Sequence, residues 1–292
     1  MKFLIIIPTH NEEKNILFCL ESLKNQTFRD YKTVVVNDGS TDQTQTIVNE
    51  FAAAHPDFEI ENLEKSEHQP GAKVVRTFNK GLEVVDFEEF DVVCKFDADI
   101  IFPENYLGKI NEIYEKNPKA GMVSGIVKIK KSVFEKRLAF DFNDEKGQWT
   151  FENISSKNHV RGPIKSYRKK CFLDMNGLRP VLGWDNIDVM LAKKHGWEVV
   201  TIKDLWVKHL RPTAYKYKNQ KAEKLGEYFY NIGLSLPLML ISSGKSSLKN
   251  QSFSEFFITL KSFLKQNHPS SLSKEEIQYI RNLRWKEMLN KK

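Results

Sequence analysis

The stretch VVCKFDAD, residues 92–99, sets two carboxylates directly behind a run of mostly apolar residues. Such runs are typical of strands buried on both faces of a parallel sheet. The stretch therefore predicts a buried strand over 92–96 that ends in Asp97 and Asp99. Mg²⁺ and Mn²⁺ prefer oxygen ligands of this kind, completed by phosphate oxygens. The pair is a candidate metal site, although surface turns also produce an isolated Asp-x-Asp pattern.

The residues before this stretch alternate between strand and helix patterns. Phe3–Ile7 and Thr33–Val36 are apolar runs of the same kind. Between the strands, apolar residues such as Ile16, Leu20 and Leu23 recur at the spacing of helices. This order predicts an α/β fold, with a mostly parallel sheet and helices on both faces. Residues 120–225 are less regular, with strands expected over 122–129 and 198–202 and a short helix near 187–191.

Polar groups stand at three of the predicted strand ends. They are Thr9 to Glu12, then Asp38, then Asp97 with Asp99. In open α/β sheets, ligands bind at the carboxyl ends of the strands. The sequence therefore predicts a ligand site at this edge of the sheet.

Five stretches together resemble bacterial family 2 glycosyltransferases, which have the GT-A fold. They are IPTHNE (7–12), VNDGSTD (36–42), GAKVVR (71–76), FDAD (96–99) and GWDNID (183–188). The resemblance covers about residues 3–210. It implies a glycosyltransferase domain over 1–225, with a donor half over about 1–105 and an acceptor half over about 106–225. A helical C-terminal extension over 226–292 would follow.

The resemblance implies a nucleotide-sugar site. Its donor-binding residues would be Thr9, Asn11, Glu12, Asp38, Lys73, Arg76 and Asp97. Asp38 would accept a hydrogen bond from a uracil or guanine edge, and Arg76 would lie near the base or the diphosphate. Two simpler interpretations stay open, since Asp38 could close an Asx turn and Glu12 could be an acid favoured at a helix N-terminus.

A metal set and a base are implied by the same resemblance. Asp97, Asp99 and His209 would hold Mg²⁺ or Mn²⁺, although His209 could equally be an ordinary hydrogen-bonding residue. The acceptor hydroxyl must lose a proton, so a carboxylate must lie within hydrogen-bond reach of it. Asp185 is the first candidate, although Trp184 stands where the family usually has glutamate. Asp188 lies three residues on and is the alternative base, or a structural cap.

The predicted function is metal-dependent transfer of a sugar from a nucleotide sugar, favouring a UDP-sugar, to a glycan or lipid-linked acceptor. Inversion at the sugar carbon is implied by the family alone, and cell-envelope polysaccharide is the expected product. A sugar-nucleotide pyrophosphorylase is an alternative, but residues 8–12 lack the glycine-rich loop it would need after the first strand. A non-catalytic nucleotide-sugar-binding protein is the other alternative.

The charge is unevenly distributed. Residues 203–292 hold 17 basic against 7 acidic side chains, a net charge of +10, whereas residues 1–202 hold 28 against 31. A basic end fits an anionic partner such as a phospholipid surface or a phosphate-linked acceptor, or it is a solvated face. No nucleic-acid-reading element is recognisable, so nucleic acid is not expected as a partner. Three widely spaced cysteines indicate a cytoplasmic protein with reduced thiols.

Residues from about 226 onward are expected to be helical, with a hinge at the serine-rich stretch 242–247. Apolar residues form a stripe there, flanked by lysines: Phe253, Phe256, Phe257, Leu260 and Leu264. The apolar stretch 228–241 is too short to span a bilayer, and the N-terminus lacks the features of a signal peptide. We therefore expect residues 226–292 to lie peripherally on the inner face of the membrane. Alternatively, the stripe packs on the catalytic domain or on a second subunit.

Overall fold

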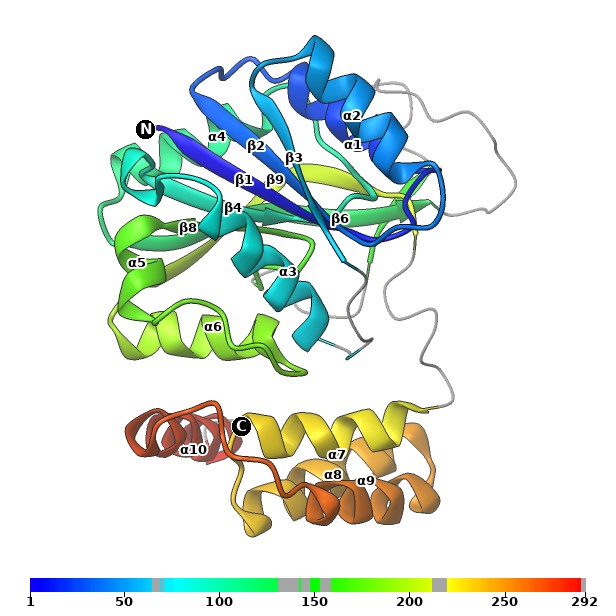
Figure 1. Cartoon of the computed structure of the whole chain (residues 1–292). Coiled ribbons are helices and arrows are strands. Elements are labelled where there is room, and N and C mark those ends of the chain that lie inside the picture. Colours follow the sequence, from blue (N-terminus) through cyan, green and yellow to red (C-terminus); the bar gives the residue numbers. More distant parts are fainter. Residues whose placement is uncertain are drawn as a thin grey trace.

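The structure is a computed structural model that describes residues 1–64, 69, 71–130, 142, 148–152, 159–211 and 220–289. One sheet runs through the larger part of the molecule (Figure 1). Its strands are β1 (Phe3–Thr9), β2 (Tyr31–Asp38), β3 (Phe58–Leu63), β4 (Val92–Phe96), β5 (Ile100–Ile101), β6 (Ala120–Lys130), β7 (Trp149–Phe151), β8 (Ile164–Arg168) and β9 (Glu198–His209).

The strand order is β3-β2-β1-β4-β8-β6-β9-β5, with β7 paired to β6. The run from β3 to β4 is parallel throughout, and β6 pairs with β9 in parallel as well. Strand β8 is antiparallel to both of its neighbours. The predicted mostly parallel sheet is therefore confirmed, with β8 inserted between its two parallel parts.

Helices cover both faces of this sheet, as predicted (Figure 1). Alternate residues of β1 point to opposite faces, so Ile5 packs beneath α1 and α2 whereas Leu4 packs against α3. The helices are α1 (Ile16–Lys24), α2 (Thr44–Ala54), α3 (Ala72–Glu83), α4 (Tyr106–Lys116), α5 (Lys169–Asp174), α6 (Trp184–Lys194), α7 (Lys221–Asn231), α8 (Leu236–Asn250), α9 (Phe253–Lys265) and α10 (Lys274–Leu289), with a 3₁₀ turn at Phe87–Glu89.

Helices α7 to α10 form a separate layer below α6 (Figure 1). This layer attaches to the loop that leads into α6. The side chain of Asn231 donates to the Leu182 carbonyl at 3.0 Å, and Arg179 pairs with Glu276 at 2.9 Å. The predicted boundary at 225/226 falls inside α7, and the division into two domains stays a prediction.

The hinge predicted at residues 242–247 is wrong, because these residues lie within α8. Ser243 and Ser247 are buried on the inner face of the helix. Small side chains let neighbouring helices approach closely, so serine here is a packing residue. A composition typical of loops therefore misled the sequence interpretation.

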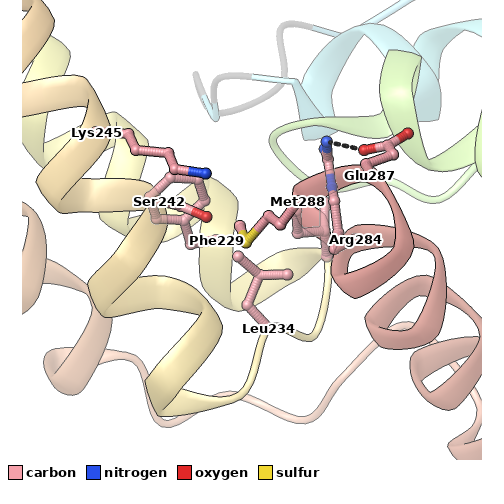
Figure 2. Close-up of a pocket in the computed structure, with 8 residues that line it drawn as sticks. Phe229, Leu234, Ser242, Lys245, Arg284, Glu287 and Met288 are labelled. Carbon is pink, nitrogen blue, oxygen red and sulfur yellow. Dashed lines mark hydrogen bonds and ion pairs between the residues drawn. The ribbon is translucent and has the colours of Figure 1, made fainter. Parts of the chain in front are cut away.

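A pocket opens among the C-terminal helices (Figure 2). Its lining residues are Phe229, Ile232, Leu234, Ser242, Lys245, Arg284, Glu287 and Met288. Arg284 donates to Glu287 and to the hydroxyl of Tyr228, each at 3.1 Å. Every lining residue belongs to α7, α8, α10 or the connection between α7 and α8, so this pocket is not the predicted donor site.

Gly183 makes a closely packed contact between the two layers, which leads to a first prediction. Its φ is +95°, and a Cβ at this position would lie 2.4 Å from Cδ2 of Tyr228. Gly196 has a similar φ of +80° but open space around it. Gly196→Ala should therefore cost about 1–2 kcal/mol through backbone strain alone. Gly183→Ala should cost about 1–3 kcal/mol more, because Tyr228 must also move.

The measurement is thermal or urea unfolding of both variants beside the unchanged protein. Equal destabilisation by the two substitutions would contradict close packing of Tyr228 on Gly183.

Candidate active site

The carboxyl ends of β1, β2 and β4 lie side by side, as the parallel order requires. Thr9 is the last residue of β1 and pairs with Asn37 of β2, while Asp97 follows directly on β4. The polar residues predicted at these strand ends therefore meet at one edge of the sheet. The structure brings Thr9, Asp38 and Asp97 to this edge and adds residues from α3 and from β9.

Asp38 is buried against α3. Its carboxylate accepts a hydrogen bond from the Thr77 hydroxyl at 3.0 Å and pairs with Lys73 at 3.3 Å. Lys73 and Thr77 are four residues apart, so they lie on the same side of the helix. Asp38 and Lys73 are thus brought together as candidate donor residues. Arg76 lies on the exposed side of α3, where it donates to Gln69 at 2.8 Å.

Thr9 and Asn11 are engaged with the backbone of the protein. The Thr9 hydroxyl donates to the Ile7 carbonyl at 3.1 Å, and the Asn11 side chain accepts from the Thr41 amide at 2.8 Å. Asn11 has a positive φ of 54°, a conformation that asparagine adopts more readily than most residues. It therefore connects the loop after β1 to the loop after β2.

Asp99 and His209 lie at the centre of a row of charged groups. His209 Nε2 is 3.5 Å from Asp99 Oδ1, and its other ring nitrogen is 3.3 Å from the Glu152 carboxylate. Glu152 also pairs with Arg161 at 2.8 Å. At the other end, Arg211 contacts Asp99 at 3.0 Å and also forms an ion pair with Glu12.

The pKa values of this row follow from its contacts. Burial alone lowers the pKa of His209, but hydrogen bonds and attraction from Asp99 and Glu152 outweigh burial and raise it to about 9. Burial raises the pKa of Asp99, yet His209 and Arg211 together hold it below its ordinary value. The row therefore favours an ionised Asp99.

These side chains fit a divalent cation once His209 has lost its proton, because an imidazole binds metal only in its neutral form. Adjacent ligands of an octahedral ion at 2.0–2.1 Å are separated by about 3 Å, close to the spacing of Asp99 and His209. Within the described residues, no group of three or more His, Cys, Asp or Glu side chains is arranged to hold a metal. A cation here would therefore need oxygen atoms from its phosphate ligand, as is usual for Mg²⁺.

Gly162 lies between two of the predicted site residues and a buried lysine, Lys95. The ammonium of Lys95 forms an ion pair with Asp97 and donates to the Gly162 carbonyl at 3.4 Å. A Cβ at Gly162 would lie 3.5 Å from Oδ2 of Asp185. Asp185 stands in the first turn of α6 and is half-buried. The predicted base and the ion pair of Lys95 with Asp97 thus both lie close to Gly162.

Comparison of the sequence with known families shows which family the chain belongs to. Residues 4–172, more than half of the chain, match the profile described as glycosyl transferase family 2. The chain belongs to this family.

Curated relatives match only part of this family 2 chain. Poly-beta-1,6-N-acetyl-D-glucosamine synthase from Staphylococcus epidermidis is 29% identical over 125 residues, which is 43% of the chain and 28% of that protein. A dolichyl N-acetyl-alpha-D-glucosaminyl phosphate 3-beta-D-2,3-diacetamido-2,3-dideoxy-beta-D-glucuronosyltransferase from Methanococcus voltae is 32% identical over 129 residues, covering 42% and 38%. The matched part is well under half the length of either relative.

Solved structures of glycosyltransferases share the whole fold. A mannosyltransferase from Pyrobaculum calidifontis, in complex with GDP-Man and Mn²⁺, has a TM-score of 0.59 at 18% identity, covering 100% of this chain and 88% of that one. S. aureus TarS in complex with UDP-GlcNAc has a TM-score of 0.56 at 21% identity, covering 96% and 78%. The predicted GT-A fold is confirmed.

Asp188, the alternative base of this family 2 site, is buried in the second turn of α6. Its carboxylate accepts hydrogen bonds from the Lys165 ammonium at 2.6 and 2.7 Å and from the Tyr167 hydroxyl at 2.6 Å. A carboxylate already surrounded by donors is poorly placed to reach a sugar hydroxyl. These contacts favour a structural role, as the sequence interpretation allowed.

Sequence reasoning left four residues of the site unassigned: Lys95, Glu152, Lys165 and Arg211. Glu152 follows a three-residue strand that carries no recognisable pattern. Lys95 and Lys165 stand in strands where charge is unexpected, and that irregularity is the one signal that could have marked them. Arg211 contacts Glu12 across 199 positions of the chain, a pairing that no local pattern predicts.

The different surroundings of the two acids on α6 lead to a second prediction. Asp188→Asn leaves the Lys165 ammonium buried without its carboxylate, so it should destabilise the protein by about 3–5 kcal/mol. Asp185→Asn should cost less than about 1 kcal/mol, because only the favourable interaction with the helix N-terminus is lost. Urea unfolding of the two variants measures the difference. Equal stability of the two would show that Asp188 does not anchor α6.

Proposed function

We propose that the protein is a metal-dependent glycosyltransferase that moves a sugar from a nucleotide-sugar donor, most suitably a UDP-sugar, to a saccharide or lipid-linked acceptor of the cell envelope. The observation that supports the proposal is the pairing of His209 with Asp99 at the sheet edge where β4 leads into Asp97. Membership of family 2 supports transfer over the pyrophosphorylase alternative. The proteins solved with GDP-Man and UDP-GlcNAc support nucleotide sugar as the donor class.

In this proposal the donor lies across the carboxyl ends of β1, β2 and β4. Asp38 accepts from the base, and its neighbour Lys73 supplies positive charge beside it. Thr9, Asn11 and Glu12 shape the loop that covers the nucleoside. Arg76, on the outer side of α3, would reach the donor only by leaving Gln69.

The reaction needs a different group on each side of the sugar, a cation at the leaving diphosphate and a base at the acceptor hydroxyl. A divalent cation held by Asp99 and His209, with Asp97 beside it, would neutralise the charge that develops on the leaving diphosphate. On the other side, the acceptor oxygen bonds to the anomeric carbon while the bond from that carbon to the diphosphate breaks. The proton of the acceptor hydroxyl passes to the carboxylate of Asp185. Attack opposite the leaving group inverts the configuration at that carbon.

Donor binding gives a third prediction. UDP or GDP should bind more tightly with Mn²⁺ than with a chelator, because the cation joins the diphosphate to the acids. Asp99→Ala should abolish this gain. Asp204→Ala is the matched control, because Asp204 is an exposed acid on the same strand as His209. Calorimetry checks both variants, and equal affinity with and without cation in the unchanged protein would refute the metal site.

The base gives a fourth prediction. Asp185→Asn keeps the size of the side chain but cannot accept the proton, so turnover should fall by about 10²–10⁴-fold. Donor affinity should barely change. The readouts are release of UDP from UDP-GlcNAc, or of GDP from GDP-mannose, and calorimetric binding of the same donors.

Two outcomes would redirect the proposal. Loss of donor binding in Asp185→Asn would make Asp185 a donor residue and not a base. Absence of any donor turnover in the unchanged protein, together with tight donor binding, would favour the non-catalytic binding protein.

A further inference from the structure

Helix α9 leaves a row of large apolar side chains in solvent. Phe253, Phe257 and Leu264 are 80%, 65% and 63% exposed. At 100° per residue they fall within about 40° of one another around the helix. Leu248, near the end of α8, is 71% exposed. We call these four residues the outer row.

The opposite side of α9 is fully used in packing. Gly226 of α7 lies so close that a Cβ there would be 2.4 Å from the Thr259 carbonyl. Thr259 and Ser262 donate to carbonyls of α7, and Leu260 and Phe263 pack onto the buried core. The predicted stripe is therefore divided between an inner, packed side and the outer row. The outer row does not pack on the catalytic domain, which was one of the alternatives.

Lysines alternate with the residues of the outer row along the sequence of α8 and α9. Residues 245–265 contain four lysines and a single acid, Glu255, which accepts a hydrogen bond from Asn250. All four lysines are exposed: Lys245, Lys249, Lys261 and Lys265. Apolar side chains flanked by lysines are typical of helices that lie in the interface of an anionic bilayer. The long lysine side chains can extend to the headgroups while the apolar row enters the acyl region.

A second copy of the chain fits this surface less well. A two-fold interface would set the same patch against itself. The four lysines of one subunit would then face the four of the other, with little acid between them. Negatively charged lipid has no such repulsion.

We propose that the outer row and its four lysines dock the protein on an anionic membrane surface. None of the helices in the described residues is both long and apolar enough to cross a bilayer. Docking is therefore peripheral, with α9 lying along the headgroups. It needs no part of the donor site, so its test is independent of transferase activity.

The experiment is flotation of the full chain with vesicles of phosphatidylcholine containing phosphatidylglycerol, and with pure phosphatidylcholine vesicles. The triple substitution Phe253→Ser, Phe257→Ser and Leu264→Ser should weaken binding to the anionic vesicles at least about tenfold, because it removes most of the inserted apolar area. The matched control replaces Leu17 and Leu173 by serine, since both are exposed on helices of the catalytic domain.

Charge is tested separately. Lys261→Gln with Lys265→Gln should weaken binding at low salt by about fivefold for each lysine. Lys116→Gln with Lys170→Gln is the control, because these lysines are 74% and 72% exposed on α4 and α5. Added salt should reduce binding of the unchanged protein.

Three outcomes would overturn the proposal. The full chain could stay in the soluble fraction with anionic vesicles at low salt. The triple variant could bind them as well as the unchanged protein does. Light scattering could show a dimer that the triple variant loses, without vesicle binding, and the outer row would then be an interface between two copies.

Discussion

Two buried ammonium groups next to each other are the constraint on which the site depends. Lys95 of β4 and Lys165 of β8 are directly paired across the antiparallel register, and they are 3% and 0% exposed. Like charges opposite each other in a sheet repel, and burial makes each one costly. Lys95 is compensated by Asp97 and the Gly162 carbonyl, whereas Lys165 is compensated by Asp188 and the Asp185 carbonyl. The contacts of Lys95 join the end of β4 to the loop before β8, and those of Lys165 join β8 to the start of α6.

Trp184 also stabilises the two buried ammonium groups. Both ammonium groups lie 5.3 Å from the centre of its ring. An aromatic face attracts cations, and more strongly where water is excluded. A glutamate, usual at this position in the family, would add a carboxylate instead. The tryptophan thus departs from the family pattern while still stabilising the two lysines. Among the described residues, Asp185 accepts a hydrogen bond only through its backbone carbonyl.

The features that could be predicted from the sequence are those that depend only on residues close together in the chain. Buried strands such as β1 and β4 are apolar runs, so their polar ends could be located without a structure. Strand β8 was missed because its sequence, IKSYR, looks exposed, whereas four of its five residues are buried. Its charges are tolerable only through partners far along the chain, such as Asp188 for Lys165. Glu152 and Arg211 were missed for the same reason, since their role depends on contacts made only in the folded protein.

The C-terminal helices also support the turn that leads into α6. Tyr228 of α7 packs on Gly183, and Asn231 bonds the neighbouring carbonyl of Leu182, so α7 supports the turn that presents Asp185. On its other side, α7 packs closely against α9 at Gly226. One helix therefore lies between the outer row and the turn before the proposed base.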